Sequence, residues 1–295
     1  MDPDNRPVFV PSGSISEAGN LTYRNGRQFE EFEEVLEQVS EAKAEQYAAV
    51  FEVDYSFANQ GSVYAAYTYN VARENSPYNG NNAISAISTG LYDPLELQWA
   101  PANNDFRHKF VAHASLPPIK GFIMSGSYVG ITGAPVTLKV NRDINGNGTS
   151  RDDLAFIFDP NDPATPEAIR ESMDIVLNNP ENLLSDYIAD NLGTRANRNG
   201  FNNPFYGNIN LRLMKSVPVI KDQQLEFSAD IFNFANLLNN EWGASSLLGG
   251  NQSLLNVTGF NQESQQFEYR VNENVGRGLA SGTPYQIQLG VRYVF

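Results

Sequence analysis

The last eleven residues of the chain, YQIQLGVRYVF at positions 285–295, place apolar side chains at every second position. Successive side chains of a β-strand point to opposite sides of a sheet, so this period of two predicts a strand with one apolar face. That face carries Tyr285, Ile287, Leu289, Val291, Tyr293 and Phe295, and the opposite face carries Gln286, Gln288, Gly290 and Arg292.

The same alternation recurs along the chain, at residues 47–57, 62–71, 106–116, 122–131, 206–217 and 224–234. Strands of ten to twelve residues are long for a globular sheet, whose strands usually have about 5–6 residues. They match the roughly 9–11 tilted residues that cross a bilayer. We therefore expect about eight long strands in residues 47–295, arranged as an all-β, transmembrane antiparallel β-barrel.

The connections between these strands differ strongly in length. Short turns at residues 58–61, 117–121 and 218–223 alternate with long polar stretches at about 73–105, 132–205 and 235–283. Outer-membrane barrels have this asymmetry, with short periplasmic turns and long extracellular loops. The pattern predicts an integral protein of the bacterial outer membrane in contact with its lipids. A soluble antiparallel sandwich with one wet face per sheet is the alternative, and it leaves the loop asymmetry unexplained.

Composition and charge exclude several classes of protein. The chain has 295 residues, no cysteine, and 34 acidic against 20 basic side chains, for a net charge of −14. It therefore has no disulfide or thiolate metal site, and it lacks the basic clusters that bind nucleic acid. The predicted inner faces carry charges that suit a watery or plugged lumen, namely Glu52, Asp54, Arg107, Lys109, Arg212, Glu226, Asp230 and Arg292.

Several longer motifs resemble one family of barrels. The chain from about residue 30 onward is similar to TonB-dependent receptors of the Oar-like kind. The motifs are LEFSADIFNFANLLNNEWG (225–243), RDINGNGTSRDDLAFIFDP (142–160), RANRNGFNNPFYGNINLRL (195–213), and AAYTYNVARENSPYNGNNAISA (65–86) before NNDFRHKF (103–110). The aromatic end at Phe295 resembles the signal that the barrel-assembly machinery reads.

The resemblance implies that the chain is the C-terminal part of a plugged barrel of about 22 strands. Coupling to TonB would then need an N-terminal plug, and these residues show neither a plug nor a TonB box. A short barrel whose eight strands close on themselves is the other interpretation, because eight is an allowed number for a small barrel.

Two segments have helical rather than strand periodicity. Residues 28–46 place Phe29, Phe32, Val35, Leu36 and Val39 at helical spacing, so we expect residues 1–46 to form an extracellular loop or rim segment with a short helix. The resemblance implies the alternative that this segment is the end of a strand leading up to Tyr47. Residues 166–194 have the same spacing, and Asn179-Pro180 is expected to divide them into two short helices within an extracellular loop.

One loop has the spacing of a calcium site. Asp143, Asn145 and Asn147 stand at positions 1, 3 and 5 with Gly148 at position 6, and Thr149 and Asp153 follow, although position 12 is Leu154 rather than glutamate. We predict calcium as a cofactor of loop 143–153; a simple Asn/Gly turn is the alternative.

No residue set supports an enzyme. The two histidines, His108 and His113, would point to opposite faces of one strand, and the chain has no nucleophile elbow, phosphate loop or HExxH motif. Trp99 and Trp242 could stack on a sugar or could pack within their own loops. We expect a receptor that binds and imports an extracellular nutrient, with a structural or adhesion barrel and a small passive porin as rivals.

Overall fold

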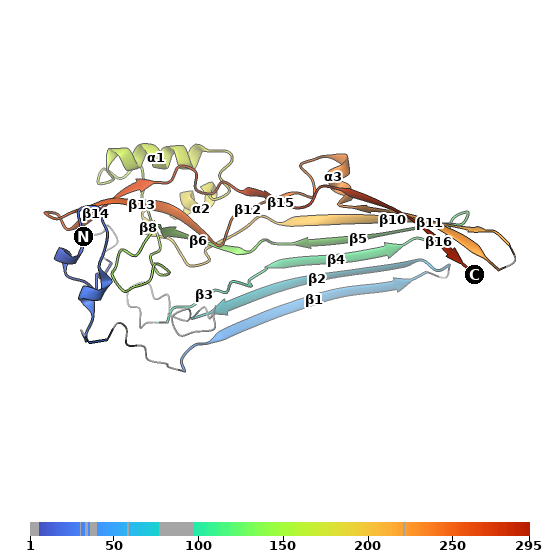
Figure 1. Ribbon diagram of the computed structural model, residues 1–295, viewed down its shortest axis with the longest axis horizontal. Coiled ribbons are helices and arrows are strands. Elements are labelled where there is room, and N and C mark those ends of the chain that lie inside the picture. Colours follow the sequence, from blue (N-terminus) through green and yellow to red (C-terminus); the bar gives the residue numbers. More distant parts are fainter. Residues whose placement is uncertain are drawn as a thin grey trace.

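A long antiparallel sheet dominates the computed structural model, which describes residues 6–29, 31–32, 35, 40–57, 59–76, 97–220 and 222–295. Seven long strands run along the long axis of the molecule (Figure 1). They are β1 (Ala44–Ser56), β2 (Ser62–Glu74), β4 (His108–Ser115), β5 (Phe122–Ile131), β10 (Tyr206–Pro218), β11 (Gln224–Phe232) and β16 (Gln286–Val294). The short strand β3 (Ala100–Pro101) pairs with the end of β2.

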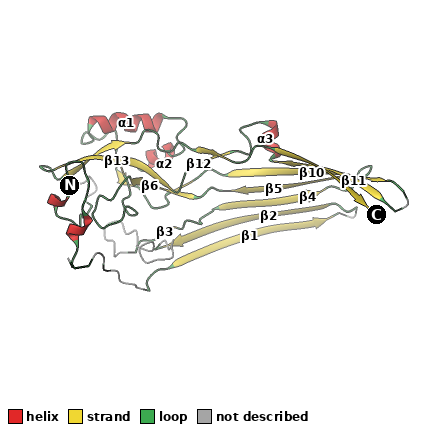
Figure 2. Ribbon diagram, viewed as in Figure 1, coloured by secondary structure: helices red, strands yellow, loops and turns green. Residues whose placement is uncertain are grey.

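The seven strands pair in chain order, β1-β2-β4-β5-β10-β11-β16, and each neighbouring pair is antiparallel. Short turns join β1 to β2, β4 to β5 and β10 to β11 at one end of the sheet, here called the turn end. The long connections leave from the opposite end, here called the loop end (Figure 2). β1 and β16 form the two edges of the sheet, which does not close on itself within the described residues.

The pairing register confirms the two faces that the sequence alternation predicted. Phe51, Tyr67 and Phe110 are partners on adjacent strands, as are Leu213, Ala229 and Leu289 at the other flank, so the apolar side chains form one continuous surface. Large members of this surface are exposed, including Phe51 (66%), Leu289 (78%) and Val291 (69%). A soluble sandwich would cover such a face with a second sheet. At about 3.3 Å per residue and a tilt of about 40°, the thirteen residues of β1 rise about 33 Å, enough to cross a bilayer.

The buried hydrophobic core lies beyond the loop end and not on the long sheet. A four-stranded sheet there has the order β14-β13-β6-β9, built from β6 (Pro135–Val140), β9 (Phe201–Asn202), β13 (Asn251–Asn261) and β14 (Gln266–Val271). Helices α1 (Glu167–Asn178) and α2 (Ser185–Asp190) pack on it (Figure 1). We call this unit, formed by residues 132–205 and 245–283 together with residues 6–29, the cap. Its fully buried side chains include Leu138, Ile157, Met173, Leu184, Ile188 and Leu254.

Small elements complete the cap and its junction with the sheet. They are two 3-10 helices (Ser12–Ser14 and Tyr23–Gly26), the strand pairs β7 (Phe156–Ile157) with β8 (Thr194–Arg195) and β12 (Ser245–Leu247) with β15 (Leu279–Ser281), and helix α3 (Phe234–Leu238). Helices α1 and α2 are the two that the sequence predicted in residues 166–194, with the break at Asn179-Pro180. No helix in the described part of the chain is both long and apolar enough to span a membrane.

The expected count of about eight strands is confirmed, and one expectation about the N-terminal region needs correction. Within the described residues the sheet has eight strands, namely the seven long ones and the two-residue β3, whereas β13 pairs with β6 and β14 in the cap. β1 begins at Ala44, so residues 44–46 of the segment expected to be helical are strand; Gln46 is held there by donating from Nε2 to Asn70 Oδ1 (2.6 Å). Residues 28, 29, 31, 32, 35 and 40–43 are not helical, and the other positions of that segment lie outside the described residues.

Candidate functional site

The inner face of the sheet is a polar wall, and a hollow of about 380 Å³ lies on it. Residues of β4, β5, β10 and β11 line it, among them His113, Ser127, Asn210, Arg212 and Asp230. Arg212 Nη1 lies 3.4 Å from Asp230 Oδ1, and these two residues are direct partners in the β10–β11 register. Adjacent strands thus supply opposite charges side by side, which neutralises the wall locally while leaving hydrogen-bonding groups exposed to the hollow.

The same charge pairing extends to the edge of the sheet. Arg292 of β16 lies opposite Glu226 of β11, with 3.7 Å between Nη1 and Oε2. At the other side His113 stacks on Tyr64 with 4.8 Å between ring centroids. The charges that the sequence indicated on β1, β4, β10, β11 and β16 therefore stand on one face, as expected for a water-filled or plugged lumen. Arg107 is the exception, because it precedes β4 and its Nε lies 2.7 Å from Asp105 Oδ2.

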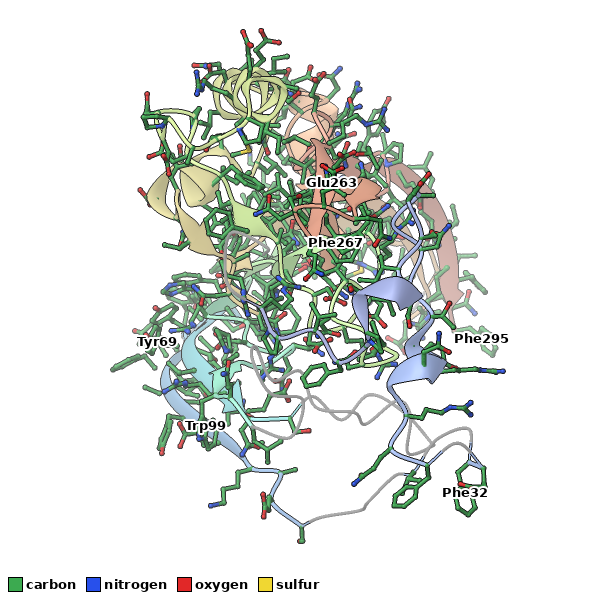
Figure 3. The ribbon with its side chains drawn as sticks, turned by 90° about the vertical axis from the view of Figure 1, so that its left-hand side faces the viewer. Phe32, Tyr69, Trp99, Glu263, Phe267 and Phe295 are labelled. Atoms are coloured by element: carbon green, nitrogen blue, oxygen red, sulfur yellow. The ribbon has the colours of Figure 1, made fainter. Side chains whose placement is uncertain are left out.

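The two histidines lie on opposite faces of β4, so they form no joint site. His108 is on the apolar face, where its Nδ1 and the hydroxyl of Tyr67 are hydrogen-bonded at 2.8 Å. His113 faces the inner wall. Tyr69 packs beside His108 and Phe110 beside Tyr67, which makes an aromatic belt near the loop end (Figure 3 labels Tyr69).

A second hollow, of about 250 Å³, lies at the loop end between two long connections. Trp99, Pro101, Asn197 and Arg198 are among its lining residues. The guanidinium of Arg73 lies 6.0 Å from the centre of the Trp99 ring. Trp99 itself is 41% exposed, so part of its ring faces solvent (Figure 3).

Loop 143–153 folds inside the cap as a compact cluster of turns held by polar side chains. We call this hydrogen-bonded loop the knot; the name does not refer to a topological knot. Asp143 accepts backbone hydrogen bonds from Asn145 (3.2 Å), Gly146 (2.6 Å) and Gly148 (3.0 Å). Asn145 and Asn147 each donate from Nδ2 to Asp152 Oδ2, at 2.9 and 2.6 Å. Gly146 and Gly148 have φ values of +80° and +87°, a backbone conformation that residues with a Cβ rarely adopt.

The predicted calcium ligands are therefore only partly brought together. Asp143, Asn145 and Asn147 share the knot, whereas the Thr149 hydroxyl turns away to accept from the backbone N–H of Arg151 (3.2 Å). Asp153 Oδ1 is paired with Nη1 of Arg6 at 2.9 Å. Within the described residues no group of three His, Cys, Asp or Glu side chains is arranged as a ready-made metal site.

Sequence reasoning missed two members of this cluster. Asp152, which accepts from both asparagines, was outside the predicted ligand set, although its position in the motif was visible. Arg6 comes from 147 residues away, and its Nη2 also donates to the carbonyl oxygen of Leu154 (2.6 Å). No signal in the loop itself could have identified that partner.

Burial dominates the electrostatics of the knot. Asp152 is 2% exposed and Asp153 is fully buried. Burial raises the pKa of Asp153 to about 8; the charges of Asp152 and Asp143 add to the rise, and Arg6 opposes it. Burial also raises the pKa of Asp143 and of Asp152, against the hydrogen bonds that each accepts.

Comparison with known families places this architecture. A family model for the outer membrane beta barrel domain matches residues 4–268. The chain belongs to the outer membrane beta-barrel domain family. Membership in this barrel family makes it an integral protein of the bacterial outer membrane, and it confirms the predicted fold class. Nothing among the curated proteins or the solved structures matches this barrel domain.

Proposed function

We propose that this barrel domain is the C-terminal barrel portion of a TonB-dependent receptor, which binds an extracellular nutrient and imports it. In this arrangement the loop end faces the outside of the cell and the turn end faces the periplasm. The ligand first contacts the cap and then passes along the polar inner wall. The observation that carries the proposal is the odd number of long strands in the sheet.

Seven antiparallel strands leave the two edge strands pointing the same way. Six antiparallel steps separate β1 from β16, and both strands run from the loop end to the turn end. Direct pairing of β1 with β16 would therefore be parallel. The same holds for pairing with the edges of a second copy that has the same orientation in the membrane.

A bilayer does not tolerate open sheet edges, because unpaired backbone N–H and C=O groups have no water to bond. Bacterial single-chain barrels are antiparallel throughout and have an even number of strands. Both edges therefore call for strands that run from the turn end to the loop end. An odd number of strands in addition to the seven long ones of the described residues meets that requirement. This supports a larger barrel and disfavours a small porin that closes with these strands alone.

The test uses the complete outer-membrane polypeptide that contains this chain. We expect it to be larger than 32.7 kDa and to be captured by the periplasmic domain of TonB after cross-linking in cells. In planar bilayers we expect no steady open channel, because a plug would fill the lumen. A TonB variant that lacks the region contacting receptors is the matched control.

Each alternative function predicts a different set of observations. A passive porin gives an ohmic conductance and no TonB capture. An adhesion barrel gives neither conductance nor capture, but the cells lose surface binding when the protein is removed. Either pattern would overturn the receptor proposal.

A further inference from the structure

The knot at residues 143–153 contains buried carboxylate oxygens that the protein leaves without hydrogen-bond partners. Oδ1 of Asp152 and Oδ2 of Asp153 are both in this state. Asp152 and Asp153 are 2% and 0% exposed, so water does not solvate these oxygens from the surface. A buried carboxylate oxygen without a hydrogen-bond partner costs folding free energy. Two such oxygens on consecutive residues therefore indicate that a binding partner is missing here.

The surrounding charges do not supply that partner. Arg6 pairs with the other oxygen of Asp153, Oδ1. Within the described residues, neither Lys139 nor any other group donates a hydrogen bond to Asp152 Oδ1 or Asp153 Oδ2.

We propose that this knot binds a calcium ion through the carboxylates of Asp143, Asp152 and Asp153 and the amide oxygens of Asn145 and Asn147. All five side chains offer oxygen, which is the ligand atom that calcium prefers. Softer metals are disfavoured because the chain has no cysteine and its two histidines lie on β4.

Binding requires the knot to rearrange, because the carboxylates in the described structure do not form a ready-made metal site and must close on the ion. The Nδ2 groups of Asn145 and Asn147 now donate to Asp152, and their Oδ1 atoms accept from the backbone N–H groups of Asn147 and Thr149 (3.0 Å each). An amide oxygen has two lone pairs, so each Oδ1 can keep its backbone bond and bind the ion once Asp152 turns from the amides to the metal. The glycines at 146 and 148 already provide the sharp bend that calcium loops need.

The ion would also hold residues 6–29 against the rest of the cap. The backbone N–H of Phe9 donates to the carbonyl oxygen of Asn145 (2.7 Å), and Arg6 holds Asp153. Val10 packs directly against Gly146, where an added Cβ would be 2.8 Å from its Cγ1. Calcium should therefore protect residues 6–29 from proteolysis, with exposed Arg24 as the trypsin site to follow.

Terbium luminescence offers a direct assay, because Tb³⁺ occupies calcium sites and is excited through a nearby tyrosine. The ring of Tyr23 lies against the knot, with its Cδ2 3.4 Å from where a Cβ on Gly148 would stand. We expect the complete protein in detergent to give saturable Tb³⁺ emission that Ca²⁺ displaces and Mg²⁺ does not. Tyr23→Phe should remove most of the emission and leave the calorimetric heat of Ca²⁺ binding intact.

Variants locate the site. Asp152→Asn should weaken Ca²⁺ binding by about tenfold or more, because affinity follows the number of charged ligands. Asp162→Asn, at an exposed turn of the same connection, should leave the affinity for Ca²⁺ unchanged. Absence of saturable emission and heat from the wild-type protein at millimolar ion overturns the proposal, and so does an Asp152→Asn protein that binds as tightly as the wild type. If Asp152→Asn does not fold, Asp143→Asn takes its place in the same comparison.

Discussion

Asp153 combines complete burial with an ion pair to Arg6, and its pKa of about 8 lies well above the ordinary value of 3.8. The folded protein therefore binds a proton at this site more tightly than the unfolded chain does. The resulting stabilisation is fully present below about pH 4 and is lost as the pH rises through about 8. The raised pKa values of Asp143 and Asp152 act in the same direction.

This gives a prediction for the stability of the cap. In a buffer with chelator, the urea concentration that permits proteolysis of the cap should fall between pH 4 and pH 8. Asp153→Asn should flatten this dependence, because the amide does not titrate. Saturating calcium should reverse the slope, since an ion binds the deprotonated carboxylates. A cap that becomes more stable with rising pH in chelator would contradict the assignment.

The terminal residue gives a second prediction at this scale. Phe295 is 93% exposed at the end of β16, and its ring lies 6.0 Å from that of Tyr293. We propose that the barrel-assembly machinery recognises this aromatic end, so Phe295→Ala should lower the amount of protein in the outer membrane several-fold. The measurement is quantitative immunoblotting of membrane fractions. Val294→Ala, whose side chain is on the other face, is the control, and equal loss in both variants would count against recognition.

At the scale of single residues, the sequence pattern identified the loop but not its partner. The spacing of Asp143, Asn145 and Asn147 follows from local turn geometry, so it could be predicted. The Arg6–Asp153 contact depends on how a distant segment packs through Val10 and Ile15. Neither residue carries a local signal of the other.

At the scale of single elements, each long strand has one face toward lipid and one toward the lumen, so the same substitution should have different effects on the two faces. Ala229 of β11 lies on the apolar face between Leu213 and Leu289, and its neighbour Ser228 lies on the inner face. Ala229→Arg should cost about 2–4 kcal/mol of barrel stability if the site is near the bilayer midplane, whereas Ser228→Arg should cost far less. Urea unfolding of the complete protein in lipid vesicles measures both. Equal destabilisation would mean that lipid does not contact this face.

Strands and helices were predictable to different extents. Each long strand carries its own period of two, and the turns are only a few residues long, so both the strands and their faces follow from local pattern. The cap does not follow in this way. β6 is a short apolar run within a polar stretch, and its partner β13 comes from another connection. Gln46 shows a smaller version of the problem: strand β1 extends over it because the pairing with β2 continues to Ala44 and Glu74, despite good helix formers nearby.

For the whole molecule, the separation of a lipid-facing sheet from a cap with its own core predicts opposite exposure of the two ends. Residues 1–295 contain no cysteine, so a cysteine introduced here is the one thiol within this range, and the protein without the substitution gives the background of labelling. Glu263→Cys, in the β13–β14 turn of the cap, should react with an impermeant maleimide on intact cells (Figure 3 shows Glu263). Asn59→Cys, in the turn between β1 and β2, should react only after the outer membrane is permeabilised. The reverse pattern would invert the orientation.

The parallel ladder between β6 and β13 bears on the order in which the molecule folds. It joins residues more than one hundred positions apart, such as Thr137 and Asn251. Contacts of such high sequence separation form late, because a long segment of chain must first be closed into a loop. Synthesis must pass β13 before β6 finds its partner, so a nascent chain that ends earlier exposes Leu138 and its apolar neighbours. The cap can therefore fold only in chains that have been synthesised past β13. Proteases that act on exposed apolar strands would remove shorter chains.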